Sequence, residues 1–181
     1  FSNAHGGIPE GEPRGLTLGS GRGLFGGGAA PSVVNIIEYI TISSLGNSVD
    51  FGDLTAVNKY PAMAASNTRA IFGGGYSGGY INVIQSVEMH SRGNAADFGD
   101  STVSKSARGG TGNSTRGLLG GGAPSNEDTI DYFAFATAAN SADFGNLTDG
   151  RQKIAACASS TRATWMGGDS PSLTDIIDYI T

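Results

Sequence analysis

The stretch Thr68–Gly75, TRAIFGGG, decides the fold, because its glycine triplet returns at a fixed interval along the chain. Triplets begin at Gly26, Gly73 and Gly120, 47 residues apart, and a degraded copy, GGD, begins at Gly167 after the same interval. A period of about 40–50 residues is typical of repeat proteins, in which one supersecondary unit cannot bury its apolar face alone. We therefore expect four similar units that pack against each other.

Three further markers keep the same register as the glycine triplets. The sequence Asp-Phe-Gly recurs at Asp50, Asp97 and Asp143. An arginine precedes each glycine cluster, and an acidic residue followed by tyrosine occurs in three of the four copies. The arginines are Arg22, Arg69, Arg116 and Arg162, and the acidic-tyrosine pairs begin at Glu38, Asp131 and Asp178. Agreement among independent markers makes a chance repeat untenable.

The second copy shows what one repeat contains. Small residues fill Lys59 to Asn67, an apolar run ends in glycine over Thr68 to Gly75, Tyr80 to Ser91 alternates apolar and polar residues, and Asn94 to Thr102 is a short turn-rich segment. Glycine is too dense for helices, and no segment keeps a helical period. Four short strands, repeated, indicate antiparallel blades of an all-β propeller.

The size of the side chains orders the strands within each predicted blade. Strands near a propeller axis are crowded, so the small residues of Ala62 to Ser66, Gly109 to Ser114 and Ala155 to Ser160 suit the innermost position. The bulky Phe51, Phe98 and Phe144 suit the outer strand, wedged between neighbouring blades. Burying one such ring contributes roughly 2–3 kcal/mol.

The blades are expected to form a single domain over residues 1–181. Their predicted bounds are about 15–55, 60–102, 107–148 and 153–181, and the last blade lacks an outer strand. Residues 1–7 echo the start of an outer strand, so we expect them to complete the fourth blade beside 174–181 and close a four-bladed ring. An open arc, completed by another copy or by a further part of the polypeptide, is the competing arrangement.

Composition limits the classes of partner. The net charge of −5 disfavours a nucleic-acid partner. No apolar run approaches the length of about 20 residues that spans a bilayer, so membrane insertion is not expected. Cys157 is the only cysteine and lies in an uncharged stretch, where we expect a buried small residue.

The repeat resembles the kelch motif. In that family an apolar run ends in a glycine doublet, a strand with tyrosine follows, an aromatic residue lies on the outer strand, and a turn leads to the next blade. The matching positions here are Leu24-Phe25-Gly26-Gly27, Asn35 to Tyr39, Asp50-Phe51 and the linker to Ala62. The outer aromatic is Phe, where the family has Trp, and Ser86 stands in the second copy where the first has Tyr39.

The wording of the repeats, such as GNSVDFGDLT at Gly46 to Thr55, resembles repeats in virion proteins of marine and cyanobacterial phages. This resemblance implies a non-catalytic structural or host-attachment module of a bacteriophage virion: a tail fibre, appendage or surface decoration in an extracellular setting. Its implied partners are neighbouring virion proteins and host surface glycan, with copies of the chain clustered as a homo-oligomer. A cellular kelch-type interaction or surface-layer protein, and a propeller glycan hydrolase or lyase, are the alternatives.

Candidate functional residues are few. The four repeated arginines are expected to pair with repeated carboxylates such as Asp53 or Asp100, with an anion-binding ring as the alternative. The loop Tyr76 to Tyr80 occurs in one copy only, and its two tyrosines could stack on a sugar or contact a protein neighbour, although an ordinary hairpin also explains them. No catalytic residue, metal site or cofactor is predicted, and His5 and His90 lack partners at metal-ligand spacing.

Overall fold

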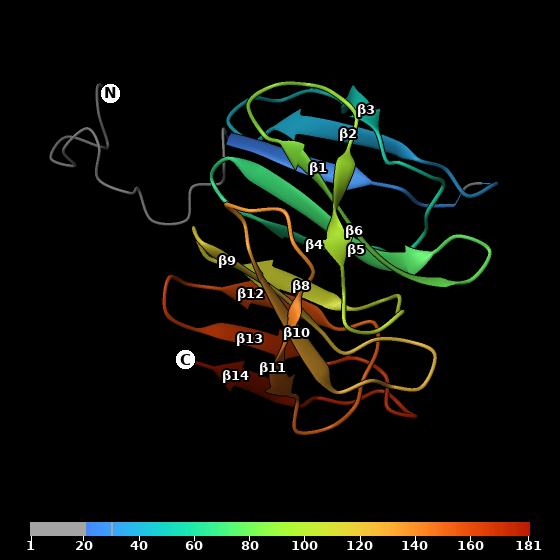
Figure 1. Cartoon of the computed structure of the whole chain (residues 1–181), viewed down its shortest axis with the longest axis vertical. Helices are drawn as coiled ribbons and strands as arrows, with labels where there is room; N and C mark the ends of the chain where they lie inside the picture. The colour runs from blue at the N-terminus through green and yellow to red at the C-terminus, as the bar shows by residue number, and fades with distance from the viewer. Residues whose placement is uncertain (1–20, 30) are drawn as a thin grey trace, which may run out of the picture.

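The computed structural model describes residues 21–29 and 31–181, and in these residues it is built of strands and turns without an α-helix (Figure 1). The strands are β1 (Arg22–Gly26), β2 (Ile36–Thr41), β3 (Val49–Asp53), β4 (Ala62–Ala65), β5 (Arg69–Tyr76), β6 (Tyr80–Glu88), β7 (Ala96–Asp100), β8 (Gly109–Gly112), β9 (Arg116–Gly120), β10 (Thr129–Ala134), β11 (Ala142–Asn146), β12 (Ala155–Ala158), β13 (Ala163–Met166) and β14 (Ile177–Ile180).

These strands form four antiparallel sheets, in which each strand pairs with its neighbours in sequence. The sheets are β1-β2-β3, β4-β5-β6-β7, β8-β9-β10-β11 and β12-β13-β14, so each repeat makes one sheet. The expectation of an all-β protein with antiparallel units is confirmed, with four strands in the second and third sheets and three described in the other two. The strand expected to begin near residue 15 and the clasp by residues 1–7 lie outside the described residues.

Glycine is required within each triplet for two different reasons. The second and third glycines have positive φ, +64° at Gly74 and +117° at Gly75, which side chains with a Cβ rarely adopt. The first glycine lies under the next sheet: a Cβ at Gly73 would come within 2.5 Å of Leu119. The triplet therefore turns the chain and at the same time admits a neighbouring sheet.

The fourth copy is shifted by one residue from its expected register. Gly167 and Gly168 have φ of +63° and +108°, which match the second and third glycines of the other copies. Met166, at the end of β13, therefore takes the place of the first glycine. The cause is a repeat that is one residue shorter, since Asp97 and Asp143 are 46 residues apart instead of 47.

Each sheet inserts one large side chain over the glycine of the sheet before it. Phe72, Leu119 and Trp165 are fully buried in this position. A Cβ would come within 2.3 Å of Phe72 if added at Gly26, and within 2.7 Å of Trp165 if added at Gly120. We call these three side chains the knobs, and the interfaces between successive sheets the seams.

The repeated outer-strand phenylalanines also lie at the seams. Phe51 of β3 is buried in one cluster with Phe72 and Met89 of the second sheet. Phe98 of β7 is buried with Leu119 of the third sheet. Phe144 of β11 is partly buried against the cluster that contains Trp165. The apolar core is thus distributed between sheets, in three clusters that each join side chains of neighbouring sheets.

The strands β4, β8 and β12, which were expected to be innermost, lie next to each other in chain order. Gly110 of β8 is so close to β4 that an added Cβ would lie 2.3 Å from the carbonyl oxygen of Met63. Two backbone hydrogen bonds join the linkers that precede these strands, from Ala107 N–H to the Tyr60 carbonyl (3.0 Å) and from Lys153 N–H to the Ala107 carbonyl (2.8 Å).

Cys157 is exposed, so the expectation that it is buried was wrong. It lies on the inner strand β12, and it lines a cavity of about 380 Å³ bordered by β1, β4, β8 and β12. Its thiol sulfur is 3.1 Å from the Thr164 hydroxyl. An inner strand has one side on this open space, which is why an uncharged stretch here does not imply burial.

We expect Gly110→Ala to destabilise the protein by about 1–3 kcal/mol or more, because the new methyl group would meet backbone atoms that cannot rotate away. Urea unfolding followed by circular dichroism measures the change. Gly93→Ala is the matched control, since nothing lies within 4 Å of a Cβ at Gly93. Equal stability of the two variants would contradict the close contact of β4 and β8.

A threonine after each outer strand donates a hydrogen bond across the seam. Thr55 Oγ1 donates to Gln85 (2.8 Å), Thr148 Oγ1 donates to Asp178 (2.6 Å), and Thr102 Oγ1 donates to Asp131. The three acceptors occupy one position, next to the knobs: Gln85 pairs with Phe72, Asp131 with Leu119 and Asp178 with Trp165. Polar and apolar contacts of the seam therefore adjoin.

The carboxylate acceptors are neutralised by buried arginines. Arg108 donates to Asp131 at 2.6 Å, and both side chains are fully buried. Its remaining N–H groups donate to the carbonyls of Gly121, Leu119 and Thr129. Burial lowers the pKa of Arg108, while Asp131 opposes that shift. A buried charge of this kind depends on its partner.

We expect Asp131→Asn to lower the free energy of unfolding by ~3–5 kcal/mol, because the Arg108 charge would stay buried without a counterion. The melting temperature should fall by roughly 6–20 °C. Asp97→Asn, at an exposed aspartate, is the control and should stay within about 0.5 kcal/mol of the wild type. Differential scanning calorimetry compares the two, and similar melting temperatures would refute the role of the pair.

Candidate functional site

The hairpin between β5 and β6 carries the most distinctive exposed group of side chains. Tyr76 and Tyr80 face each other across the hairpin, with ring centroids 5.3 Å apart in an edge-to-face arrangement. Lys59 Nζ lies 4.8 Å from the ring centroid of Tyr76 and 5.7 Å from that of Tyr60. We call Lys59, Tyr60, Tyr76 and Tyr80 the tyrosine cluster.

The tyrosine cluster has a rigid base. Asn58 is buried, its Nδ2 donates to the Gly74 carbonyl (2.9 Å), and its Oδ1 accepts from the Tyr76 N–H (2.9 Å). Lys59 exchanges two backbone hydrogen bonds with Tyr76. Buried polar contacts thus hold the aromatic rings in place from below.

The outer surface of the cluster is open. Tyr60 is 61% exposed and Tyr80 is 41% exposed. Aromatic rings combine an apolar face with a polar hydroxyl, and such rings are common in binding sites that are partly wet. With one cation beside them, they could stack on a sugar ring and bind its hydroxyl or acidic groups.

The sequence singled out Tyr76 and Tyr80, and the structure brings them together. Lys59 and Tyr60 were missed, because they belong to the linker before β4 and not to the loop. The only signal was their uniqueness: the equivalent residues before β8, which make the same backbone contacts, are Ser106 and Ala107.

Each of the four repeated arginines lies against an aromatic ring. Their guanidinium carbons lie over rings at 4.9 Å (Arg22 on Tyr39), 5.6 Å (Arg69 on Phe98), 5.0 Å (Arg116 on Tyr132) and 4.6 Å (Arg162 on Tyr179). None of the four pairs with Asp53 or Asp100, contrary to expectation, and Arg69 pairs with Glu88 of its own sheet at 2.8 Å. Each guanidinium group thus lies against an aromatic ring.

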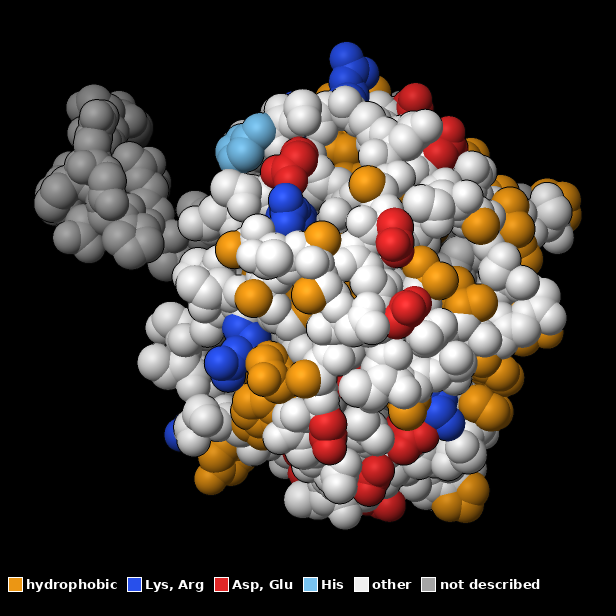
Figure 2. Space-filling model, viewed as in Figure 1, with side chains coloured by type: hydrophobic (Ala, Val, Ile, Leu, Met, Phe, Trp, Pro, Cys, Tyr) orange, Lys and Arg blue, Asp and Glu red, His pale blue; other side chains and the backbone are white. Residues whose placement is uncertain are grey.

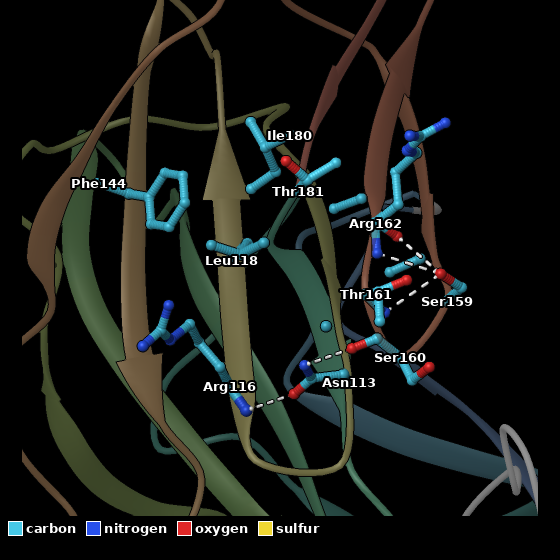
Figure 3. A pocket seen from close by; sticks show the side chains of 13 residues that line it. Asn113, Arg116, Leu118, Phe144, Ser159, Ser160, Thr161, Arg162, Ile180 and Thr181 are labelled. Carbon is cyan, nitrogen blue, oxygen red and sulfur yellow. Dashed lines mark hydrogen bonds between the residues drawn. The ribbon is translucent and has the colours of Figure 1, made fainter.

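A small pocket of about 90 Å³ lies between the third and fourth sheets (Figure 3). Asn113 Nδ2 donates to the Ser160 carbonyl across it, and the Ser159 hydroxyl oxygen accepts from the N–H groups of Thr161 and Arg162. In Figure 3 the guanidinium groups of Arg116 and Arg162 point in different directions. Its polar groups thus mainly tie two turns together, and the arginines do not converge on one point.

In the part of the chain that the structure describes, no three His, Cys, Asp or Glu side chains gather to hold a metal ion. His90 is exposed, and His5 lies outside the described residues. On the face in Figure 2, basic side chains are scattered and form no continuous patch. No helix in the described ranges is long and apolar enough to cross a membrane.

Comparison with protein-family models gives no match, and comparison with curated proteins also gives none.

An ion pair lies beside the base of the tyrosine cluster. Lys105 Nζ is 2.8 Å from Glu127, and the Lys105 carbonyl accepts a hydrogen bond from Gly75 N–H. The Thr129 hydroxyl also donates to Glu127 (3.0 Å). The hydrogen bond from Lys105 is the main cause that lowers the pKa of Glu127, against a weaker opposing effect of burial.

We expect Glu127→Gln to destabilise the protein by about 1 kcal/mol or less at pH 7. Because the pKa of Glu127 is lower in the folded state, its contribution is full above the unfolded pKa of about 4.3 and is lost as pH falls through the folded pKa. The difference between wild type and variant should therefore disappear in acid. Urea titrations from pH 7 to pH 2.5 measure it, and a difference that grows in acid would contradict the assignment.

Proposed function

We propose that this chain is a kelch-like β-propeller protein whose four sheets are blades, and that it acts as a non-catalytic binding module of a bacteriophage virion. Support for the blades comes from one antiparallel meander per repeat and from the same seam contacts between successive sheets. Support for a virion setting comes from the resemblance of the repeats to phage virion proteins. The module would belong to a tail fibre, an appendage or a surface decoration.

The single observation that carries the binding role is the tyrosine cluster. Its exposed rings and single cation suit a glycan of the host surface, preferably one with acidic groups. The pairing of Tyr76 with Tyr80 at the end of the hairpin exists in one repeat only, so the seams between repeats do not require it. A contact with a ligand would explain why these aromatic residues are exposed.

The enzyme alternative is less well supported. A glycan hydrolase generally needs two carboxyl groups that face the same bond. Among the described residues, the carboxylates of Asp131 and Asp178 are buried, and each is bound to an arginine and a threonine. These contacts between sheets leave neither carboxylate free to act on a substrate. A cellular interaction protein would share the proposed binding surface and differ only in where it is found.

Binding can be tested with immobilised host-surface polysaccharides, both acidic and neutral. We expect the wild type to bind, and Tyr60→Ala or Tyr80→Ala to weaken binding about tenfold, as loss of one stacked ring implies. Tyr179→Ala, at a tyrosine exposed elsewhere, is the control. Unchanged binding by both cluster variants would reject the site.

The virion setting needs a separate measurement. Mass spectrometry and antibody labelling of purified phage particles from the source should find the chain in a regular copy number. Its presence only in cell fractions would favour the cellular interaction protein and would leave the tyrosine cluster as its binding surface.

A further inference from the structure

Two contacts join successive sheets. At two of the three seams, an arginine at the start of a strand donates to a carbonyl of the following sheet: Arg22 of β1 to Met89 (2.8 Å) and Arg69 of β5 to Phe135 (2.6 Å). The following sheet inserts its knob over the earlier sheet, as described above. Each interior sheet therefore has a face that receives its predecessor and a face that receives its successor.

The first sheet has residues in the positions that elsewhere contact the preceding sheet, but no preceding sheet covers them in the described residues. Phe25 pairs with Glu38 as Phe72 pairs with Gln85, so it holds the position of a knob. It is nevertheless 54% exposed, whereas the three other knobs are fully buried.

Ile42 of the first sheet holds the position of the carbonyl acceptors. Its N–H donates to the Gly21 carbonyl, as Met89 N–H donates to Thr68 and Phe135 N–H to Thr115. Ile42 is 49% exposed, whereas Met89 and Phe135 are buried. We call Phe25 and Ile42 the leading face.

In the fourth sheet, the residues that elsewhere are covered by the following sheet are exposed. Ile177 pairs with Met166 as Ile37, Ile84 and Ile130 pair with the first glycine of their triplets. Those three isoleucines are at most 1% exposed, and Ile177 is 65% exposed.

Arg162 holds the position of Arg22 and Arg69 and lies on the exposed ring of Tyr179. We call Arg162, Met166 and Ile177 the trailing face. In Figure 1 the first and fourth sheets lie at opposite ends of the long axis.

We propose that a second copy of this chain docks head to tail, with its leading face on the trailing face. In this seam Arg162 donates to the carbonyl of Ile42 of the partner subunit, and Ile177 is covered by Phe25 of the partner subunit. Met166 replaces the glycine, so the phenylalanine ring packs against a flexible thioether instead of entering a gap. The contact continues an interface that the chain already makes three times.

Such a contact joins two different surfaces, so it is heterologous and repeats from copy to copy. It produces a closed ring if the rotation between copies closes, and a filament if it does not. Glu38 keeps its bond to the Ser48 hydroxyl in this arrangement. The inference stands on the seams and does not depend on the ligand or the location of the protein.

Sedimentation velocity of the chain at about 1–100 µM tests the proposal, in the range where interfaces of ordinary affinity associate. We expect mass to rise with concentration. Phe25→Asp and Ile177→Asp should each abolish self-association, because each removes one of the two faces. Both side chains are exposed in the single chain, so circular dichroism should show that both variants fold.

Mixing the two variants gives the sharper result. Phe25→Asp keeps its trailing face and Ile177→Asp keeps its leading face, so an equimolar mixture should form a dimer and stop there. Tyr80→Ala is the control and should associate as the wild type does. A wild type that stays monomeric at every concentration would overturn the proposal in favour of faces covered within one polypeptide, as would variants that associate normally or a mixture that does not pair.

Discussion

The structure depends on the close approach of each sheet to the backbone of the sheet before it. At Gly26, Gly73 and Gly120 the absence of a Cβ leaves space that Phe72, Leu119 and Trp165 fill. Each of these side chains contributes roughly 2–3 kcal/mol by leaving water. The large residue and the glycine are consecutive on one strand, as Phe72 and Gly73 are on β5, so a repeat that offers a gap on one side presents a knob on the other. This coupling explains why the spacing of the repeats tolerates so little variation.

At the polar contacts of the seam, each anionic acceptor has a buried arginine beside it. At the position that accepts the threonine, Gln85 is neutral and has no arginine bound to it among the described contacts. Asp131 and Asp178 are anionic, and each has a buried arginine, Arg108 and Arg151. The two arginines come from different positions of the repeat: Arg108 directly follows the left-handed residue of its linker, whereas Arg151 precedes the one at Lys153 by two residues. Two solutions thus satisfy one electrostatic requirement.

The sequence was sufficient for the period, the strands and the antiparallel pairing, because these depend on backbone geometry and on residue size. It failed where the partners of a side chain come from another strand. The aromatic neighbours of the repeated arginines, and the ion pairs of Arg108 and Arg151, involve residues 16 to 29 positions away in sequence. The shift at Met166 was hidden by a single deletion that leaves two glycines in apparent register. Exposure of Cys157 depends on a cavity that no local pattern reveals.

The tyrosine cluster illustrates how a repeated scaffold can carry a site that is not repeated. Tyr60, Ala107 and Lys153 have the same left-handed backbone, with φ from 54° to 58°. Since Ala107 N–H bonds to Tyr60 and Lys153 N–H to Ala107, the backbone at this position serves the contact between sheets. The side chain takes no part in these backbone bonds, and it differs in every copy. A tyrosine here, next to a hairpin whose strands pair further in one repeat, adds an exposed surface and leaves the seams unchanged.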